Sequence, residues 1–341
     1  MYDLRSMLPE ELEQLMSELG EPKFRAKQLF SWLQSGVASF DEMSNIPKSL
    51  REKLSETGYI ANAEPEEKFE SQLDETVKFL FRMNDGLHIE SVLMKYQHGY
   101  SICISTQIGC RMGCSFCAST VNGLDRSLTA SEMLAQIMSA QQSCGVRVSN
   151  IVLMGMGEPF DNYDNVLRFL RHVSHEDGLN IGMRHISLST CGRVDGIRRL
   201  ADEKLQLTLS VSLHAPNDKI RTAIMPINKK WQVGPLLDAC RDYIAATGRR
   251  ISFEYAMIKG VNDSDECAEE LAHRLHGMLC HVNLIPANEV RENDYVRSDA
   301  ARLVRFKQLL EKRGITTTVR RTLGADISAS CGQLRQKYVK K

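Results

Sequence analysis

The 341-residue chain has no excess of either charge, few residues that break regular structure and no long apolar run. Its 43 Lys and Arg balance 43 Asp and Glu, so the chain as a whole is not drawn to nucleic acid or to an anionic membrane. Nine prolines and 22 glycines exclude a collagen-like or broadly disordered chain. No run of about 18 apolar residues occurs, so we expect no membrane span. A folded, water-soluble protein remains, in which any nucleic-acid binding must come from local charge.

The N-terminal sequence MYDLRSMLPEELEQL is acidic and amphipathic, without the basic and apolar regions of a signal peptide. We therefore expect a cytoplasmic protein whose thiols are kept reduced. Ten cysteines are present, and in that compartment they indicate metal or catalytic chemistry rather than a disulfide framework.

Hydrophobic periodicity predicts four segments. Residues 1–60 have helical spacing and are expected to form a small accessory domain. Residues 61–98 carry two alternating stretches around Asp85-Gly86, the pattern of a β-hairpin, which we expect to link two units. Residues 99–322 are expected to form the main α/β domain, and residues 323–341 a C-terminal loop and basic tail.

Strand-like and helix-like stretches alternate along the main domain. The expected strands are 101–106, 150–154, 185–190, 207–213, 251–257 and 281–285. The expected helices are 129–143, 163–175, 194–203, 232–246, 264–277 and 299–313. Six such units predict a parallel sheet with helices outside it, as a partial barrel or a doubly wound sheet. In both architectures ligands bind at the carboxyl ends of the strands, so motifs that follow strands are candidate sites.

Three cysteines, Cys110, Cys114 and Cys117, follow the first strand with C-x3-C-x2-C spacing. A structural zinc ion normally has four ligands, and neither a fourth nearby cysteine nor a histidine follows here. An iron–sulfur cluster held by three thiolates would leave one iron open to chelate a small molecule. The second strand ends at Gly155-Met-Gly-Glu158-Pro159, where glycines let the backbone approach a ligand. An iron–sulfur cluster beside a ligand is favoured, with zinc as the alternative.

Both motifs resemble those of the radical S-adenosylmethionine (AdoMet) superfamily. From about residue 20 to residue 335 the chain resembles the RlmN/Cfr family of RNA adenine methyltransferases, on the motifs Ser189-Thr190, Ser212-Leu-His-Ala-Pro-Asn-Asp218, Met225-Pro-Ile-Asn-Lys-Lys230, Val261-Asn-Asp263, Asn283-Leu-Ile-Pro286 and Cys331-Gly-Gln-Leu334. The resemblance implies a partial (β/α)6 barrel with a small N-terminal helical domain and a connecting β-hairpin.

The resemblance also implies the cofactors and their residues. A [4Fe-4S] cluster would be held by Cys110, Cys114 and Cys117, and AdoMet would chelate its fourth iron. By motif position the AdoMet pocket is formed by Gly157, Glu158, Ser189, Ser212, Leu213, His214 and Asn288. Outside its motif, a lone histidine such as His214 after an apolar strand would be interpreted as structural.

The chemistry implied by the resemblance uses two AdoMet molecules per turnover. The Cys331 thiolate takes a methyl group from the first, because the thiolate is the nucleophilic form of cysteine. Reductive cleavage of the second produces a radical on that methyl group, which adds to the electron-poor adenine carbon. Glu90 then removes the ring proton, and Cys103 attacks the Cys331 sulfur, leaving a transient disulfide. From strand pattern alone, Glu90 would be a solvated carboxylate and Cys103 a buried thiol.

Local charge gives a candidate RNA contact. Residues 302–341 hold eleven Lys and Arg against two acidic residues, a net charge of +9 beside Cys331. Such a segment is typical of phosphate contacts, although a solvated helix face with a basic tail has the same composition. Residues 1–60 hold ten acidic and seven basic residues, so we expect that domain to read RNA shape. The target adenine would have to flip out of its stack.

Gly157-Glu158-Pro159 and His214-Ala-Pro-Asn-Asp218 resemble the carbon-2 (RlmN) branch, which implies methylation of adenosine-2503 in 23S rRNA and of adenosine-37 in tRNA. The family commonly has Asp-Ile-Asp-Ala-Ala-Cys where this chain has Asp326-Ile-Ser-Ala-Ser-Cys331, and a proline where Glu289 follows Asn288. The alternatives are a carbon-8 (Cfr-like, antibiotic-resistance) methyltransferase and a non-catalytic iron–sulfur or zinc RNA-binding protein. We further expect a monomer that takes electrons from a flavodoxin or ferredoxin.

Overall fold

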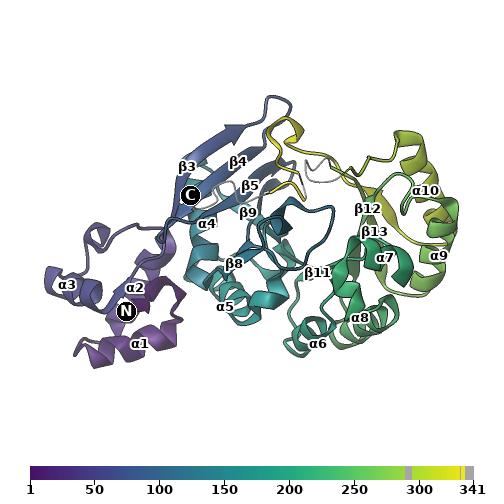
Figure 1. The fold of residues 1–341 in the computed structure, drawn as a ribbon. Helices are drawn as coiled ribbons and strands as arrows, with labels where there is room; N and C mark the ends of the chain where they lie inside the picture. The colour runs from purple at the N-terminus through teal and green to yellow at the C-terminus, as the bar shows by residue number, and fades with distance from the viewer. Residues whose placement is uncertain (289–293, 331, 335–341) are drawn as a thin grey trace.

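The computed structural model describes residues 1–288, 294–330 and 332–334. One ten-stranded sheet forms the centre of the described molecule, in the order β14-β13-β12-β11-β10-β9-β6-β5-β4-β3. Helices lie along the outside of this curved sheet, and a separate group of N-terminal helices lies at one end (Figure 1). No helix in the described part of the chain is long and apolar enough to cross a membrane.

The larger part of the sheet consists of parallel strands. It comprises β6 (Gly99–Cys103), β9 (Val148–Leu153), β10 (Ile186–Thr190), β11 (Thr208–Ser212), β12 (Ile251–Met257), β13 (Cys280–Pro286) and β14 (Thr317–Val319). The six expected strands are confirmed within a few residues. A seventh, β14, was not expected, because three residues are too few to show a period. A doubly wound sheet reverses its strand order; here the order never reverses, which confirms the partial barrel.

The expected outer helices are also confirmed: α4 (Ala130–Cys144), α5 (Tyr163–Ser174), α6 (Val194–Asp202), α8 (Val233–Thr247), α9 (Asp265–Leu275) and α10 (Ala300–Lys312). Local sequence sets their ends. Thr129 and Glu132 form a reciprocal capping box at the start of α4, and Gly145, with φ of 62°, ends that helix in a left-handed conformation. A short helix that we did not expect, α7 (Asp218–Ile224), follows β11.

The remaining strands extend the same sheet. The expected hairpin is present as β4 (Val77–Met83) and β5 (His88–Tyr96), and a third strand, β3 (Ala63–Glu70), joins its outer edge. Strand β5 pairs antiparallel with β6, with Val92 opposite Cys103. The hairpin therefore continues the barrel sheet, which brings β4 and β5 to the edge of the barrel.

The N-terminal helices α1 (Pro9–Glu18), α2 (Phe24–Ser35) and α3 (Lys48–Thr57) have their own apolar core. Buried Arg5 donates to the carbonyls of Leu33, Val37 and Ala61, which holds the loops of this core together. The His172 ring on α5 hydrogen-bonds the Ser6 carbonyl at 2.9 Å, so this unit docks on the outside of the barrel.

Candidate functional site

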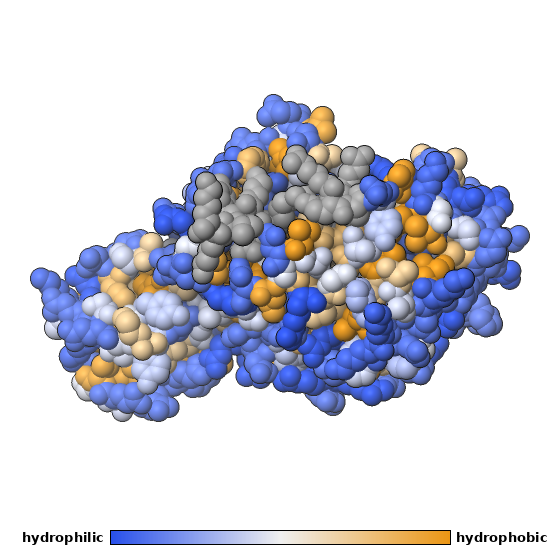
Figure 2. Space-filling view, viewed as in Figure 1, coloured by the Kyte–Doolittle hydropathy of each residue, from blue (hydrophilic) through white to orange (hydrophobic). Residues whose placement is uncertain are grey.

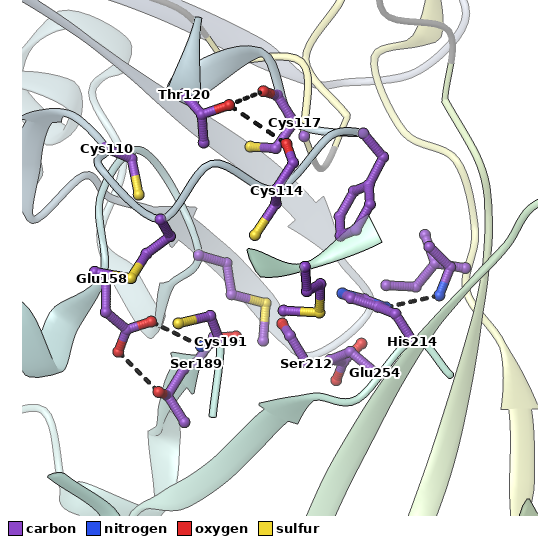
Figure 3. A pocket seen from close by; sticks show the side chains of 18 of the residues that line it. Cys110, Cys114, Cys117, Thr120, Glu158, Ser189, Cys191, Ser212, His214 and Glu254 are labelled. Atoms are coloured by element: carbon purple, nitrogen blue, oxygen red, sulfur yellow. Dashed lines mark hydrogen bonds between the residues drawn. The ribbon is translucent and has the colours of Figure 1, made fainter. Parts of the chain in front are cut away.

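A large cavity lies at the carboxyl ends of the parallel strands (Figure 3). Its volume is about 160 Å³, and it opens to solvent at the ends of the strands. Figure 2 shows hydrophobic residues gathered in the middle of this face and hydrophilic residues around them. Of the residues expected from sequence, the cavity is lined by Cys110, Cys114, Cys117, Gly157, Glu158, Ser189, Ser212, His214 and Asn288.

The three loop cysteines form one wall of this cavity. Cys110 and Cys114 are buried, and Cys117 is half-buried. The loop has its own internal bonds, because the Thr120 hydroxyl donates to the carbonyls of Cys114 (3.3 Å) and Cys117 (2.9 Å). The Ser115 amide donates to the Ile224 carbonyl at 3.0 Å, which fastens the loop to the end of α7.

Burial and mutual proximity both disfavour the thiolate forms of these cysteines, and a bound cation would offset that effect. Burial raises the pKa of Cys110 to about 12 and the pKa of Cys114 well above its ordinary value, and the neighbouring thiols add to both shifts. Iron would hold them as thiolates. Within the described residues, no three His, Cys, Asp or Glu side chains converge as ligands of a single metal ion. A cluster distributes its thiolates over several irons, so the donor set fits that group.

The Gly157-Glu158 segment joins the ends of β9 and β10. Gly157 has φ of 103°, and a Cβ there would lie 2.6 Å from the Cβ of Gln107, so only glycine fits. The Glu158 carboxylate accepts from the Cys191 amide (2.7 Å), the Thr190 hydroxyl (2.8 Å) and the Phe160 amide (3.1 Å). Burial raises the pKa of Glu158. The Glu158 carboxylate therefore links the loop after β9 to the end of β10 at the floor of the cavity.

Replacement of Glu158 by glutamine is expected to lower the free energy of unfolding by about 1–3 kcal/mol, because an amide that points its NH2 group at these donors leaves one of them unsatisfied. Urea denaturation of the full chain measures the change. The matched control is Glu176→Gln, at an exposed position, which should unfold like the parent protein. Equal stability of the two variants would contradict this bonding role.

His214 adopts a left-handed conformation with φ of 54° and faces the cavity. Its Nδ1 accepts the Ala256 amide at 2.9 Å, so the neutral ring carries its proton on Nε2. Burial lowers the pKa of His214 to about 3, which keeps the ring neutral near pH 7. Leu213, by contrast, does not line the cavity: its side chain is buried in the core, and its amide bonds the Glu254 carbonyl.

Among the residues of the cavity wall that sequence analysis missed, three carry titratable groups: Cys191, Glu254 and Arg320. Cys191 directly follows β10, so its position after a strand was a usable signal. Glu254 lies within β12 and accepts from Asn283 at 2.9 Å, and Arg320 follows the unexpected strand β14. Arg320 pairs with Glu254 at 3.8 Å, a contact between strands that no local pattern encodes.

A second, smaller cavity of about 40 Å³ adjoins the first and contains Cys103. Asn288 and Arg320 line both cavities. Ala329, Ser330 and Leu334 line the second cavity too, and the Ser119 hydroxyl holds the Leu334 carbonyl at 2.7 Å. The C-terminal segment thus packs against the cysteine loop. Cys331 itself lies outside the described residues.

Glu90 lines neither cavity but lies on the sheet close to the second one. Its side chain is 0% exposed, so the interpretation as a solvated carboxylate is wrong. Lys78 on the adjacent strand pairs with Glu90 at 3.5 Å and donates to the Ser328 carbonyl at 3.3 Å. The C-terminal segment covers this part of the sheet, which explains the burial.

Much of the positive charge of residues 302–341 is paired. Arg302 and Arg305 on α10 bind Asp265, and Arg313 pairs with Glu269 at 2.7 Å. Both acids belong to α9, so two carboxylates of the neighbouring helix offset two of these three positive charges. Arg320 also pairs with Glu254, so the described cations of this segment without an ion pair are Lys312 and Arg321. Residues 335–341 of the tail lie outside the described residues.

Comparisons with known proteins agree with this geometry. Residues 104–272 match the radical SAM superfamily, and residues 2–60 match the ribosomal RNA large subunit methyltransferase N-terminal domain. The probable dual-specificity RNA methyltransferase RlmN of Clostridium novyi is 55% identical over 341 residues, covering 100% of this chain and 99% of that protein. The corresponding Thermoanaerobacter protein is 51% identical, with 100% and 99% covered. A radical SAM methyltransferase structure from Sphaerobacter thermophilus has a TM-score of 0.95 and 46% identity, covering 99% of this chain and 100% of that one.

Proposed function

The chain belongs to the RlmN/Cfr family of radical AdoMet RNA methyltransferases, and from that membership we propose that it methylates carbon 2 of adenine in 23S rRNA and in tRNA. It is a methyltransferase that uses a [4Fe-4S] cluster and AdoMet. The observation that supports the proposal most directly is the shared cavity of the three loop thiols, Glu158 and His214.

In this proposal, different residues of the cavity wall bind different parts of the cofactors. Cys110, Cys114 and Cys117 hold the cluster, which supplies the electron for reductive cleavage of AdoMet when it is bound. Gly157 gives the methionyl part of AdoMet room against the backbone, and Glu158 maintains the floor of the pocket. Ser189, Ser212, His214 and Asn288 supply polar groups around the rest of the ligand, and buried Leu213 supports this wall from behind.

Three other residues act on the methyl group and the base. Cys331 carries the methyl group to the adenine, Glu90 takes the ring proton, and Cys103 resolves the adduct by attacking the Cys331 sulfur. In support, Ser330 beside Cys331 lines the same small cavity as Cys103. Burial of Glu90 against Lys78 places a carboxylate where little water competes for the proton.

The partners follow from the same reaction. We place the protein in the cytoplasm as a monomer, with flavodoxin or ferredoxin as electron donor. Arg321, which is exposed and lines the smaller cavity, is the described cation best placed to meet RNA phosphates beside a flipped adenine. The N-terminal helices would contact the RNA fold farther away.

Identification of the modified nucleoside tests the proposal. RNA from cells that lack their own enzyme and express this chain should contain 2-methyladenosine in both 23S rRNA and tRNA, detected by mass spectrometry after digestion. Cells expressing Cys331→Ser, which keeps the size of the side chain but not the thiolate, are the matched control and should lack it. Finding 8-methyladenosine instead would assign the carbon-8 activity, and finding neither would leave a non-catalytic RNA-binding protein.

A further inference from the structure

Arg221 on α7 is a fully buried cation, and the site as described so far gives it no role. Its guanidinium donates to five oxygen acceptors, all of them uncharged: the carbonyls of Cys191 (2.6 Å), Ser212 (3.0 Å), Leu213 (3.1 Å) and Trp231 (3.4 Å) and the side-chain oxygen of Asn228 (3.0 Å). These acceptors satisfy the N–H groups of the guanidinium, but none carries a negative charge that would offset its positive charge.

No carboxylate among the described residues forms an ion pair with this guanidinium. The acid closest in sequence, Asp218, begins the same helix, yet its carboxylate accepts from the Asn228 amide at 3.0 Å and from the Val233 amide at 2.8 Å. A buried charge without a counter-ion is costly, and natural proteins normally pair it. The structure therefore contains a local positive potential that no ion pair among the described residues cancels, and Asp218 opposes it electrostatically without pairing with the guanidinium.

That potential lies directly behind the cavity wall. The guanidinium is so close to the backbone after β10 that a Cβ on Gly192 would lie 2.9 Å from Nη2. Helix α7 is fastened to the cysteine loop by Ser115 and Ile224, and Cys114, Cys191 and Ile224 pack in one apolar cluster. After burial, the charge of Arg221 is the next cause that lowers the pKa of His214. Arg221 does not line the cavity, so its charge acts on a group bound there without direct contact.

We propose that Arg221 is the counter-charge of the cluster, and that it makes one-electron reduction of the cluster easier. The inference rests on the proposed function only for the presence of the [4Fe-4S] group. A cluster held by three thiolates has a net negative charge, and reduction makes that charge more negative. A fixed cation in a dry, apolar surrounding stabilises the more negative state more strongly, so it raises the reduction potential. Arg221 is thus a positioning residue that acts through the cluster.

The test compares two variants that both lose hydrogen bonds of the guanidinium but differ in charge. Arg221→Met removes the charge, and Arg221→Lys keeps it while losing most of the five bonds. Midpoint potentials of the reconstituted cluster are measured by redox titration followed by electron paramagnetic resonance. We expect Arg221→Met to lower the equilibrium constant for reduction about tenfold, which is about 59 mV for one electron. Arg221→Lys should stay close to the parent protein.

A merely structural role predicts a different outcome. If Arg221 were only structural, both variants would unfold at a lower temperature, and their midpoint potentials would either stay unchanged or shift by the same amount. Either result for the potentials overturns the proposal. If Arg221→Met does not fold, Arg221→Gln decides, because the neutral amide also removes the charge but can keep some of the hydrogen bonds; its potential should fall as well, and an unchanged or less negative potential overturns the proposal. Because the readout needs no RNA, failure of the nucleoside test and failure of this inference are separate results.

Discussion

A Cys114→Ala protein is expected to lose its iron and to methylate RNA at least about 100-fold more slowly, a larger effect than the loss of residues that only orient metal ligands. Cys114 is buried and belongs to the apolar cluster that contains Ile224, and Cys117 packs against the same cluster. Two remaining thiols would leave a second iron of the cluster without a protein ligand. Iron and sulfide content after anaerobic reconstitution, together with the absorbance of the cluster, measure the loss.

The matched control for that experiment is Cys144→Ala. Cys144 is a half-buried thiol at the end of α4 and does not line the main cavity, so iron content and turnover should match those of the parent protein. Full iron content and normal turnover in Cys114→Ala would refute the ligand assignment. Loss of iron from both variants would instead point to damage to the fold, which circular dichroism would reveal.

Cys103→Ala is expected to accumulate a covalent protein–RNA adduct in place of free methylated RNA. Cys103 ends β6, is buried, and lines the small cavity together with Ser330 and Leu334, which lie on either side of Cys331 in the chain. Alanine leaves the reactions before resolution intact but removes the thiolate that must attack the Cys331 sulfur. The adduct should therefore become the dominant product after one turnover.

Denaturing gels with labelled RNA detect the adduct as a slowly migrating band that ribonuclease removes. Cys280→Ala serves as the control, because Cys280 is also a buried strand cysteine but lines neither cavity. That variant should release free RNA at the parent rate. Free product with normal turnover from Cys103→Ala would contradict the resolution step, while no product and no adduct would show that Cys103 acts earlier.

The parts of the site that could be predicted from sequence share one property: they lie in loops directly after strands. The spacing of Cys110, Cys114 and Cys117 and the Gly157-Glu158 motif both follow strands that periodicity located correctly. Cys191 satisfied the same criterion, but no motif spacing marked it. Leu213 shows what a motif leaves open, because motif membership does not reveal which side of a strand end faces the cavity.

The parallel sheet, the outer helices and the loops that meet at the cavity could all be predicted from the amino-acid sequence, because apolar periodicity and turn residues are local, and parallel strands bring their carboxyl ends to one edge. The ion pairs and buried charges could not be predicted in this way. The tertiary structure paired Glu90 with Lys78, neutralised Arg302 with Asp265 and left Arg221 among carbonyls. Burial and counter-ions depend on what distant segments place against a side chain, and no local pattern contains that information.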